Sequence, residues 1–239
     1  MSTRVSKRVK ENAKLVERDR AYKLDDAMVE IKKLKTTKFD ESIDIHVKLA
    51  ADPNASDQVV RGTVVLPHGT GRKVRVVVLT KDEAGKDAQA AGAELVGGDD
   101  LIAKILGGWM EFDVLIASPS MMKDIAKLGR VLGPRGLMPS PKAGTVTDKL
   151  GDAVKEIKKG RIEFKMDKQG NVNASVGKHS FQPKALTENG LTFLRALAEA
   201  KPKGVKGDFF KTAYLSTTMG PSWKIDLAPI LKEMLAEEA

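Results

Sequence analysis

The composition of the chain changes within PHGTGRKVRVVVLT, residues Pro67 to Thr80. Its first half combines Pro and Gly, which favour loops, and its second half is an almost unbroken apolar run. Such a run is typical of a strand buried on both faces, as in a parallel sheet covered by helices. FDVLIAS (112–118) repeats the run, and helical patterns lie between the two in KDAQAAGAELV (86–96) and DDLIAKILGG (99–108). This alternation predicts a Rossmann-like α/β unit over residues 67–159.

The segments on either side of this unit follow a different pattern. Ile43, Ile45, Val47 and Leu49 alternate with polar residues, which predicts a strand with one buried and one solvated face. The same alternation runs through residues 161–176 and predicts a β-hairpin there.

A helix is expected near 183–200, followed by a strand-loop-strand pair in FFKTAYLSTTMGPSWKID (209–226). We therefore expect an α/β protein of two domains. Residues 1–66 and 160–239 would form one discontinuous α+β domain, with residues 67–159 inserted into it. One continuous α/β sheet is the alternative.

Composition limits the possible functions. The 239 residues include 41 Lys and Arg against 32 Asp and Glu, a net charge of +9, and the pI is near 9.5. A basic chain favours polyanionic partners such as nucleic acid, although the same charge can serve solubility alone. The chain has no Cys and only three scattered His, so we expect no metal or other cofactor. The charged N-terminus and the lack of long apolar runs indicate a cytoplasmic protein without a membrane partner.

The glycine-rich segments do not match the known phosphate-binding or catalytic motifs. Gly177-Lys178 is followed by His179 instead of Ser or Thr, so a P-loop is excluded. A dinucleotide fingerprint beginning at Gly69 would need Gly or Ala at position 74, which is Val. The sequence therefore predicts no enzyme. A nucleotide-dependent enzyme that uses the inserted α/β unit is the alternative.

Several segments instead carry residues suited to RNA. Hydroxyls and a closely approachable glycine backbone can contact ribose and phosphate, and lysines can contact phosphate. Each segment also has an ordinary structural reading: a Gly-Pro turn, a core phenylalanine or a solvated charged face. The predicted contacts are Lys165 and Lys168 on the hairpin, Thr217, Thr218, Met219, Gly220 and Ser222 in the second loop, and Lys38 and Phe39 before the first strand.

A further loop, residues 129–142, offers a secondary RNA contact through Arg130, Arg135 and Lys142. Its alternative role is a structured cap on the inserted sheet. The chain holds only seven Phe, two Tyr and two Trp, so recognition by many stacked aromatics is not expected.

Long motifs in these loops resemble one family. KLGRVLGPRGLMPSPKAGTV (127–146), TKFDESIDIHVKL (37–49), VRGTVVLPHGTG (60–71), GRIEFKMDKQG (160–170) and STTMGPS (216–222) are similar to the signatures of the large-subunit ribosomal protein L-one family. The resemblance runs from about residue 5 to residue 226, in the family's order. It implies the same split architecture, with an inserted Rossmann-like domain.

The resemblance also implies function. The discontinuous domain would bind large-subunit (23S-type) ribosomal RNA and form the mobile stalk near the exit site, where deacylated tRNA is released. The chain would also bind a similar fold in its own operon mRNA as a translational repressor. Independently of the resemblance, the sequence shows no obvious apolar patch, so we expect a monomer off the ribosome. The contacts that the resemblance implies are Lys38, Phe39, Ser42, Lys165, Lys168, Thr212 and the turn Thr218-Met219-Gly220.

Overall fold

The computed structural model describes residues 6–17, 20–34, 37–55, 57–81, 84–202, 204–205 and 207–237. The protein is of the α/β class, as predicted. Contacts gather into two compact units, Met1–Gly71 with Ile162–Ala239 and Arg72–Arg161. These boundaries lie five residues after the predicted 66/67 boundary and two residues after the predicted 159/160 boundary.

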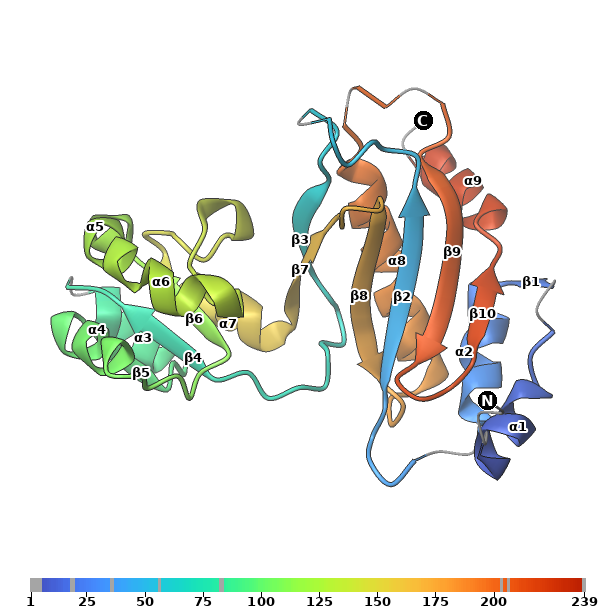
Figure 1. The fold of residues 1–239 in the computed structure, drawn as a ribbon, viewed down its shortest axis with the longest axis horizontal. Coiled ribbons are helices and arrows are strands. Elements are labelled where there is room, and N and C mark those ends of the chain that lie inside the picture. The colour runs from blue at the N-terminus through green and yellow to red at the C-terminus, as the bar shows by residue number, and fades with distance from the viewer. Residues whose placement is uncertain are drawn as a thin grey trace, which may run out of the picture. The chain divides into compact units, whose positions relative to one another are not determined.

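The first unit is built around a five-stranded sheet in the order β1-β10-β9-β2-β8 (Figure 1). Strand β1 is parallel to β10, and the other neighbours are antiparallel. Strands β3 and β7 form a separate two-stranded sheet. The elements of this unit are α1 (Lys7–Ala13), β1 (Ala21–Tyr22), α2 (Leu24–Lys32), β2 (Ser42–Leu49), β3 (Arg61–Val65), β7 (Arg161–Lys165), β8 (Asn171–Lys178), α8 (Pro183–Glu199), β9 (Phe210–Thr217), β10 (Ser222–Ile225) and α9 (Ala228–Glu237).

The two faces of this sheet differ in chemistry. The apolar residues of β2 are at most 1% exposed, and they pack against α2 and α8 in one core that includes the fully buried Trp223 and Phe193. The residues between them are partly exposed and face the other way. In Figure 1 this polar face is turned toward the viewer, and none of the described helices crosses β8, β2 and β9 on that side. The sheet thus offers a rigid, solvated platform.

The predicted hairpin over residues 161–176 is wrong. Strand β7 pairs with β3, whereas β8 pairs with β2, and a single bridge joins Met166 to Val172. Asp167 closes the turn between them, since its Oδ1 accepts the Gln169 and Asn171 N–H groups, both at 2.8 Å. The Met166 N–H donates to the Val60 carbonyl at 2.9 Å, so this side of the turn belongs to a different strand pair. Alternation alone cannot identify the partner of a strand.

The second unit is a three-stranded parallel sheet in the order β5-β4-β6 with helices on both faces. Val77 and Leu79 of β4 pack with α4 on one face, and Val76 and Val78 pack with α3 and α7 on the other. Its elements are β4 (Val76–Leu79), α3 (Ala84–Ala90), β5 (Leu95–Gly97), α4 (Asp99–Leu106), β6 (Val114–Ala117), η1 (Pro119–Met121), α5 (Met122–Ile125), η2 (Ala126–Leu128), α6 (Gly129–Leu132), η3 (Gly133–Arg135), η4 (Pro141–Ala143) and α7 (Leu150–Lys159).

The helix expected over residues 86–96 is shorter than predicted. It ends at Ala90, and Leu95–Gly97 form strand β5 beside β4. Gly92 between them has a φ of +96°, a conformation that stops a helix and that residues with a Cβ rarely adopt. Pairing with β4 then outweighs the helical preference of the Ala-rich segment.

The crossing segment 67–71 belongs to the first unit because Asn189 of α8 holds it. The Asn189 side chain is fully buried; its Oδ1 accepts the His68 N–H at 3.1 Å, and its Nδ2 donates to the Gly69 carbonyl at 2.9 Å. A second donation, to the Val176 carbonyl at 2.8 Å, ties the same amide to β8.

The described helices include none that is long and apolar enough to cross a membrane.

Asn189→Ala should therefore destabilise the first unit. The substitution removes one acceptor and two donations inside the core, and the expected loss in the free energy of unfolding is about 2–3 kcal/mol. Urea denaturation in a Trp109→Phe background measures this unit, since Trp223 then reports alone. Asn54→Ala, at a loop position, is the control with an expected change below about 0.5 kcal/mol. An equal, small effect of both changes would show that Asn189 does not anchor the crossing.

Candidate RNA-binding surface

The two loops singled out in the sequence meet where β2 begins. The Ser42 N–H donates to Thr218 Oγ1, and the Thr218 N–H donates to the Ser42 carbonyl, both at 3.1 Å. The register of β2 with β9, Ile43 opposite Thr217, brings these loops together although 176 residues separate Ser42 from Thr218. The structure therefore places Ser42 beside the turn 218–220, with Lys38 and Phe39 in the loop that leads into β2. Strand β2 begins at the lower end of the sheet in Figure 1.

A buried carboxylate holds this junction. Glu41 is 3% exposed, and its two oxygens accept the Thr37 N–H at 3.2 Å and the Met219 N–H at 3.1 Å. Arg8 of α1 places Nη1 3.6 Å from Glu41 Oε1. Burial by itself would raise the pKa of Glu41, but the hydrogen bonds from the Met219 and Thr37 N–H groups outweigh burial and hold the pKa below its usual value. Glu41 is thus a charged anchor for both loops.

The two loops that Glu41 holds each carry a large apolar side chain that is exposed to solvent. Phe39 is 52% exposed and Met219 is 54% exposed, so the reading of Phe39 as a core residue is wrong. Gly220 allows the turn to close this tightly, because a Cβ there would lie 2.2 Å from Thr217 Oγ1. Exposed apolar side chains on a rigid polar rim are typical of a contact surface.

The structure corrects the role of Thr217. Its side chain is 4% exposed and lies on the core side of β9, and its carbonyl accepts the Gly220 N–H at 3.2 Å. The period of two along a strand explains the difference, because Ser216 and Thr218 face the other way. Thr217 supports the turn, whereas Thr218 and Ser222 are exposed.

A third segment, at the end of β8 and directly after it, also belongs to the site, although its residues were not predicted from the sequence. Lys178 at the end of β8 donates from Nζ to Ser42 Oγ at 2.8 Å. Ser180 donates to Asp40 from its N–H at 3.0 Å and from its Oγ at 2.7 Å. These bonds fix the loop that carries Lys38 and Phe39. Nothing in the sequence marks them, because they depend on the pairing of β2 with β8.

The other predicted contacts lie at the opposite end of the sheet. Thr212 of β9 is paired with Lys48 of β2, six residues from Ser42, or about 20 Å along the strand. Lys48 Nζ donates to the carbonyl of Gln169, in the turn that carries Lys168. Lys165 and Lys168 are exposed there. The predicted set therefore forms two groups, one at each end of β2.

Between the two groups the polar face carries a hydrogen-bonded row. His46 at the centre of β2 bonds to Asn173 of β8 through Nδ1 at 2.8 Å and to Ser216 of β9 through Nε2 at 3.0 Å. The alternation in β2 could have indicated His46, since it places the residue on the polar face. Its partners follow only from the strand order.

The second unit carries the predicted secondary contacts at separate positions on its own surface. Arg130 lies in α6, Arg135 in η3 and Lys142 in η4, and all three are exposed.

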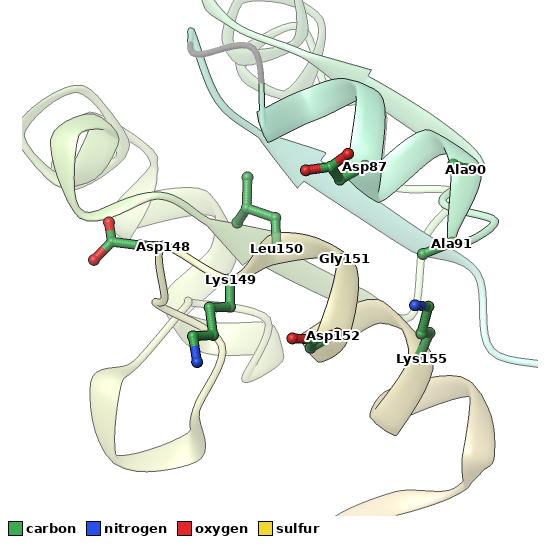
Figure 2. A pocket seen from close by; sticks show the side chains of 9 residues that line it. All are labelled: Asp87, Ala90, Ala91, Asp148, Lys149, Leu150, Gly151, Asp152 and Lys155. Carbon is green, nitrogen blue, oxygen red and sulfur yellow. The ribbon is translucent and has the colours of Figure 1, made fainter.

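A pocket of about 510 Å³ lies between α3 and the start of α7 (Figure 2). Asp87, Asp148 and Asp152 line it together with Lys149 and Lys155. Three carboxylates there disfavour a phosphate group at the N-terminus of α7. Among the described residues, no group of three or more His, Asp or Glu could hold a metal ion.

Comparison with known proteins identifies the class. Residues 31–221 match the model of the Ribosomal protein L1p/L10e family, so the chain falls among the ribosomal proteins. It is 52% identical to the large ribosomal subunit protein uL1 of Thermus thermophilus, over 212 residues that cover 88% of this chain and 93% of the relative. The protein of the same name from Kosmotoga olearia is 51% identical, with 92% of this chain and 96% of the relative covered. The corresponding figures for Persephonella marina are 48%, 94% and 95%.

The chain therefore belongs to the Ribosomal protein L1p/L10e family, as the motifs indicated. This family consists of structural, non-enzymatic proteins. The alternative of a nucleotide-dependent enzyme is wrong.

The lowered pKa of Glu41 predicts how acid affects the first unit. Because the folded-state pKa lies below the ordinary value, the charged carboxylate stabilises the unit at neutral pH. That contribution is lost as the pH falls through the ordinary carboxyl range to the lowered pKa. In Glu41→Gln the amide NH2 faces one of the two backbone N–H groups, so we expect a loss of about 1–3 kcal/mol at pH 7. This difference from the unaltered protein should shrink on acidification.

Urea denaturation at a series of pH values measures both effects. Glu199→Gln, at an exposed position near the end of α8, is the matched control and should leave the pH profile unchanged. A Glu41→Gln protein with the unaltered stability and pH profile would contradict the anchoring role.

Proposed function

We propose that this chain is a structural constituent of the large ribosomal subunit whose discontinuous first domain binds 23S-type ribosomal RNA. In this proposal it forms the mobile stalk near the exit site and assists the release of deacylated tRNA. It also represses translation by binding its own operon mRNA. Its location is the cytoplasm, on the ribosome, and off the ribosome it is a monomer. The names of its relatives as large ribosomal subunit proteins support the first part.

The observation that carries RNA binding is the preorganised loop junction above Glu41. Phe39 and Met219 are exposed there, beside the Thr218 hydroxyl and the Lys178 ammonium group. Because hydrogen bonds already hold the loops, little conformational entropy remains to be lost on binding. Hydroxyl, lysine and backbone groups read the sugar and phosphate chemistry of RNA, and the two apolar side chains exclude water.

The spacing of the two groups favours a folded RNA. Contacts near Ser42 and near Lys168 are separated by most of the length of β2, on one rigid sheet. A folded RNA can present two backbone segments at a fixed distance, whereas a flexible single strand must be ordered to do so. An mRNA that adopts the same fold would use the same surface, so repression requires no second site.

The inserted unit has a separate part in the proposal. It is joined to the first unit by two crossings, at 71/72 and at 161/162. Two short connections permit hinge motion. Arg130, Arg135 and Lys142 would supply weaker contacts to RNA from this unit.

Binding to a stalk RNA fragment across a salt series tests the proposal, with an unrelated duplex of equal length as the comparison. Tight and selective binding that survives moderate salt is expected, because sugar and shape contacts do not depend on counterion release. Equal binding to both RNAs that is lost as the salt concentration rises would mean that the net charge of +9 attracts any RNA nonspecifically. The site assignment would then be overturned.

Met219→Ala and Thr218→Ala should each weaken binding to the stalk RNA by about 1–3 kcal/mol, the range for a good interface contact. Thr218→Ser keeps the hydroxyl that accepts the Ser42 N–H, so it should restore most of the affinity. Leu106→Ala, at a residue of α4 that is 49% exposed, is the control for loss of an exposed apolar side chain. Affinities are measured by filter binding or calorimetry at one salt concentration. No loss in either of the first two variants would remove the turn from the site.

A further inference from the structure

A pocket beside the turn 218–220 shares only Ser222 with the surface described above. It has a volume of about 370 Å³ and is lined by Ala13, Val16, Tyr214, Pro221, Ser222 and Lys224. Pro221 and Ser222 directly follow Gly220, so the pocket continues the loop junction toward β10 and α1. The N-terminal segment forms one wall, and the polar face of the sheet forms another.

The sheet wall of this pocket is aromatic. Tyr214 is 38% exposed and lies on the polar face of β9, since its neighbours Ala213 and Leu215 are fully buried. In register it is flanked by His46 of β2 and Lys224 of β10. A tyrosine ring on an open sheet face is a stacking surface for a nucleobase.

The remaining lining residues complete the chemistry of a nucleotide site. Ala13, Val16 and Pro221 are apolar, and Val16 also packs against the core of the first unit, which fixes that wall. The Lys224 ammonium group can contact a phosphate, and the exposed Ser222 hydroxyl can contact a ribose or a phosphate. The lining contains no carboxylate among the described residues, in contrast to the pocket between α3 and α7.

We propose that this pocket holds one unpaired nucleotide of the RNA that binds at the adjacent turn. Its base stacks on Tyr214, and its phosphate lies against Lys224. The proposal rests on the proposed RNA-binding function, because one lysine and one aromatic ring give a free nucleotide little affinity. Once the rest of the RNA is bound at the turn, the effective concentration of the neighbouring nucleotide is high and the pocket is filled.

Two substitutions test the stacking and the charge separately. Tyr214→Leu should weaken binding of the stalk RNA fragment roughly five- to tenfold, as expected for the loss of one stacked base. It should leave the salt dependence unchanged. Lys224→Gln should also weaken binding, and it should lower the slope of log Kd against log salt by about one. Lys104→Gln, an exposed position on α4, is the matched control and should alter neither quantity.

A fluorescent base locates the nucleotide. 2-Aminopurine is placed in turn at each unpaired position of the fragment. One position should change its emission on binding the unaltered protein and should fail to do so with Tyr214→Leu. Thermal unfolding of the Tyr214 variant confirms that the first unit is intact.

The outcomes separate the two proposals. Selective binding by the unaltered protein, with no effect of Tyr214→Leu and the same probe response in the variant, would overturn the pocket proposal alone. Binding of adenosine monophosphate by itself, with an equal loss in Tyr214→Leu, would also overturn it, because the pocket would then be a free-nucleotide site. Failure of the unaltered protein to select the stalk RNA would overturn the proposed function and the pocket proposal together.

Discussion

The buried carboxylate of Glu41 is the interaction on which the geometry of the candidate site depends. A charge this far from solvent is stable only where donors surround it, and here the donors are the backbones of two loops that approach from distant parts of the chain. The Glu41 carbonyl also accepts the His179 N–H at 2.8 Å, which adds the segment after β8. One residue therefore joins three segments, and the exposed Phe39 and Met219 stand on that junction.

The sheet supplies the rest of the platform. Its apolar face is covered by α2 and α8, so the positions of its strands are set by the core. The polar face is therefore held in a fixed geometry although its own side chains are not part of the core. These side chains form hydrogen bonds between neighbouring strands, as His46 does with Asn173 and Ser216. The apolar face thus makes the sheet rigid, and the polar face remains exposed for binding. A rigid surface loses little conformational entropy when a large partner binds.

Much of the fold could be predicted, for identifiable reasons. The apolar runs of β4 and β6 and the alternation in β2 are direct consequences of burial on two faces or on one. The hairpin over residues 161–176 could not be predicted correctly, since β7 and β8 carry alternation that fits any partner. The site shows the same division. The exposed turn residues Thr218 and Met219 could be found from their chemistry, whereas Lys178 and Ser180 enter only through strand pairing.

By itself, the sequence determined the α/β class, the basic charge, the membership in a ribosomal family and most of the exposed residues of the candidate surface. These depend on composition, on short periods and on contiguous motifs, all of which are local. Only the tertiary structure decided which strands are neighbours, that Thr217 faces inward, that Asn189 holds the crossing segment, and that Glu41 is buried. Each of these depends on contacts between residues far apart in the chain, and a local pattern carries no information about its distant partner.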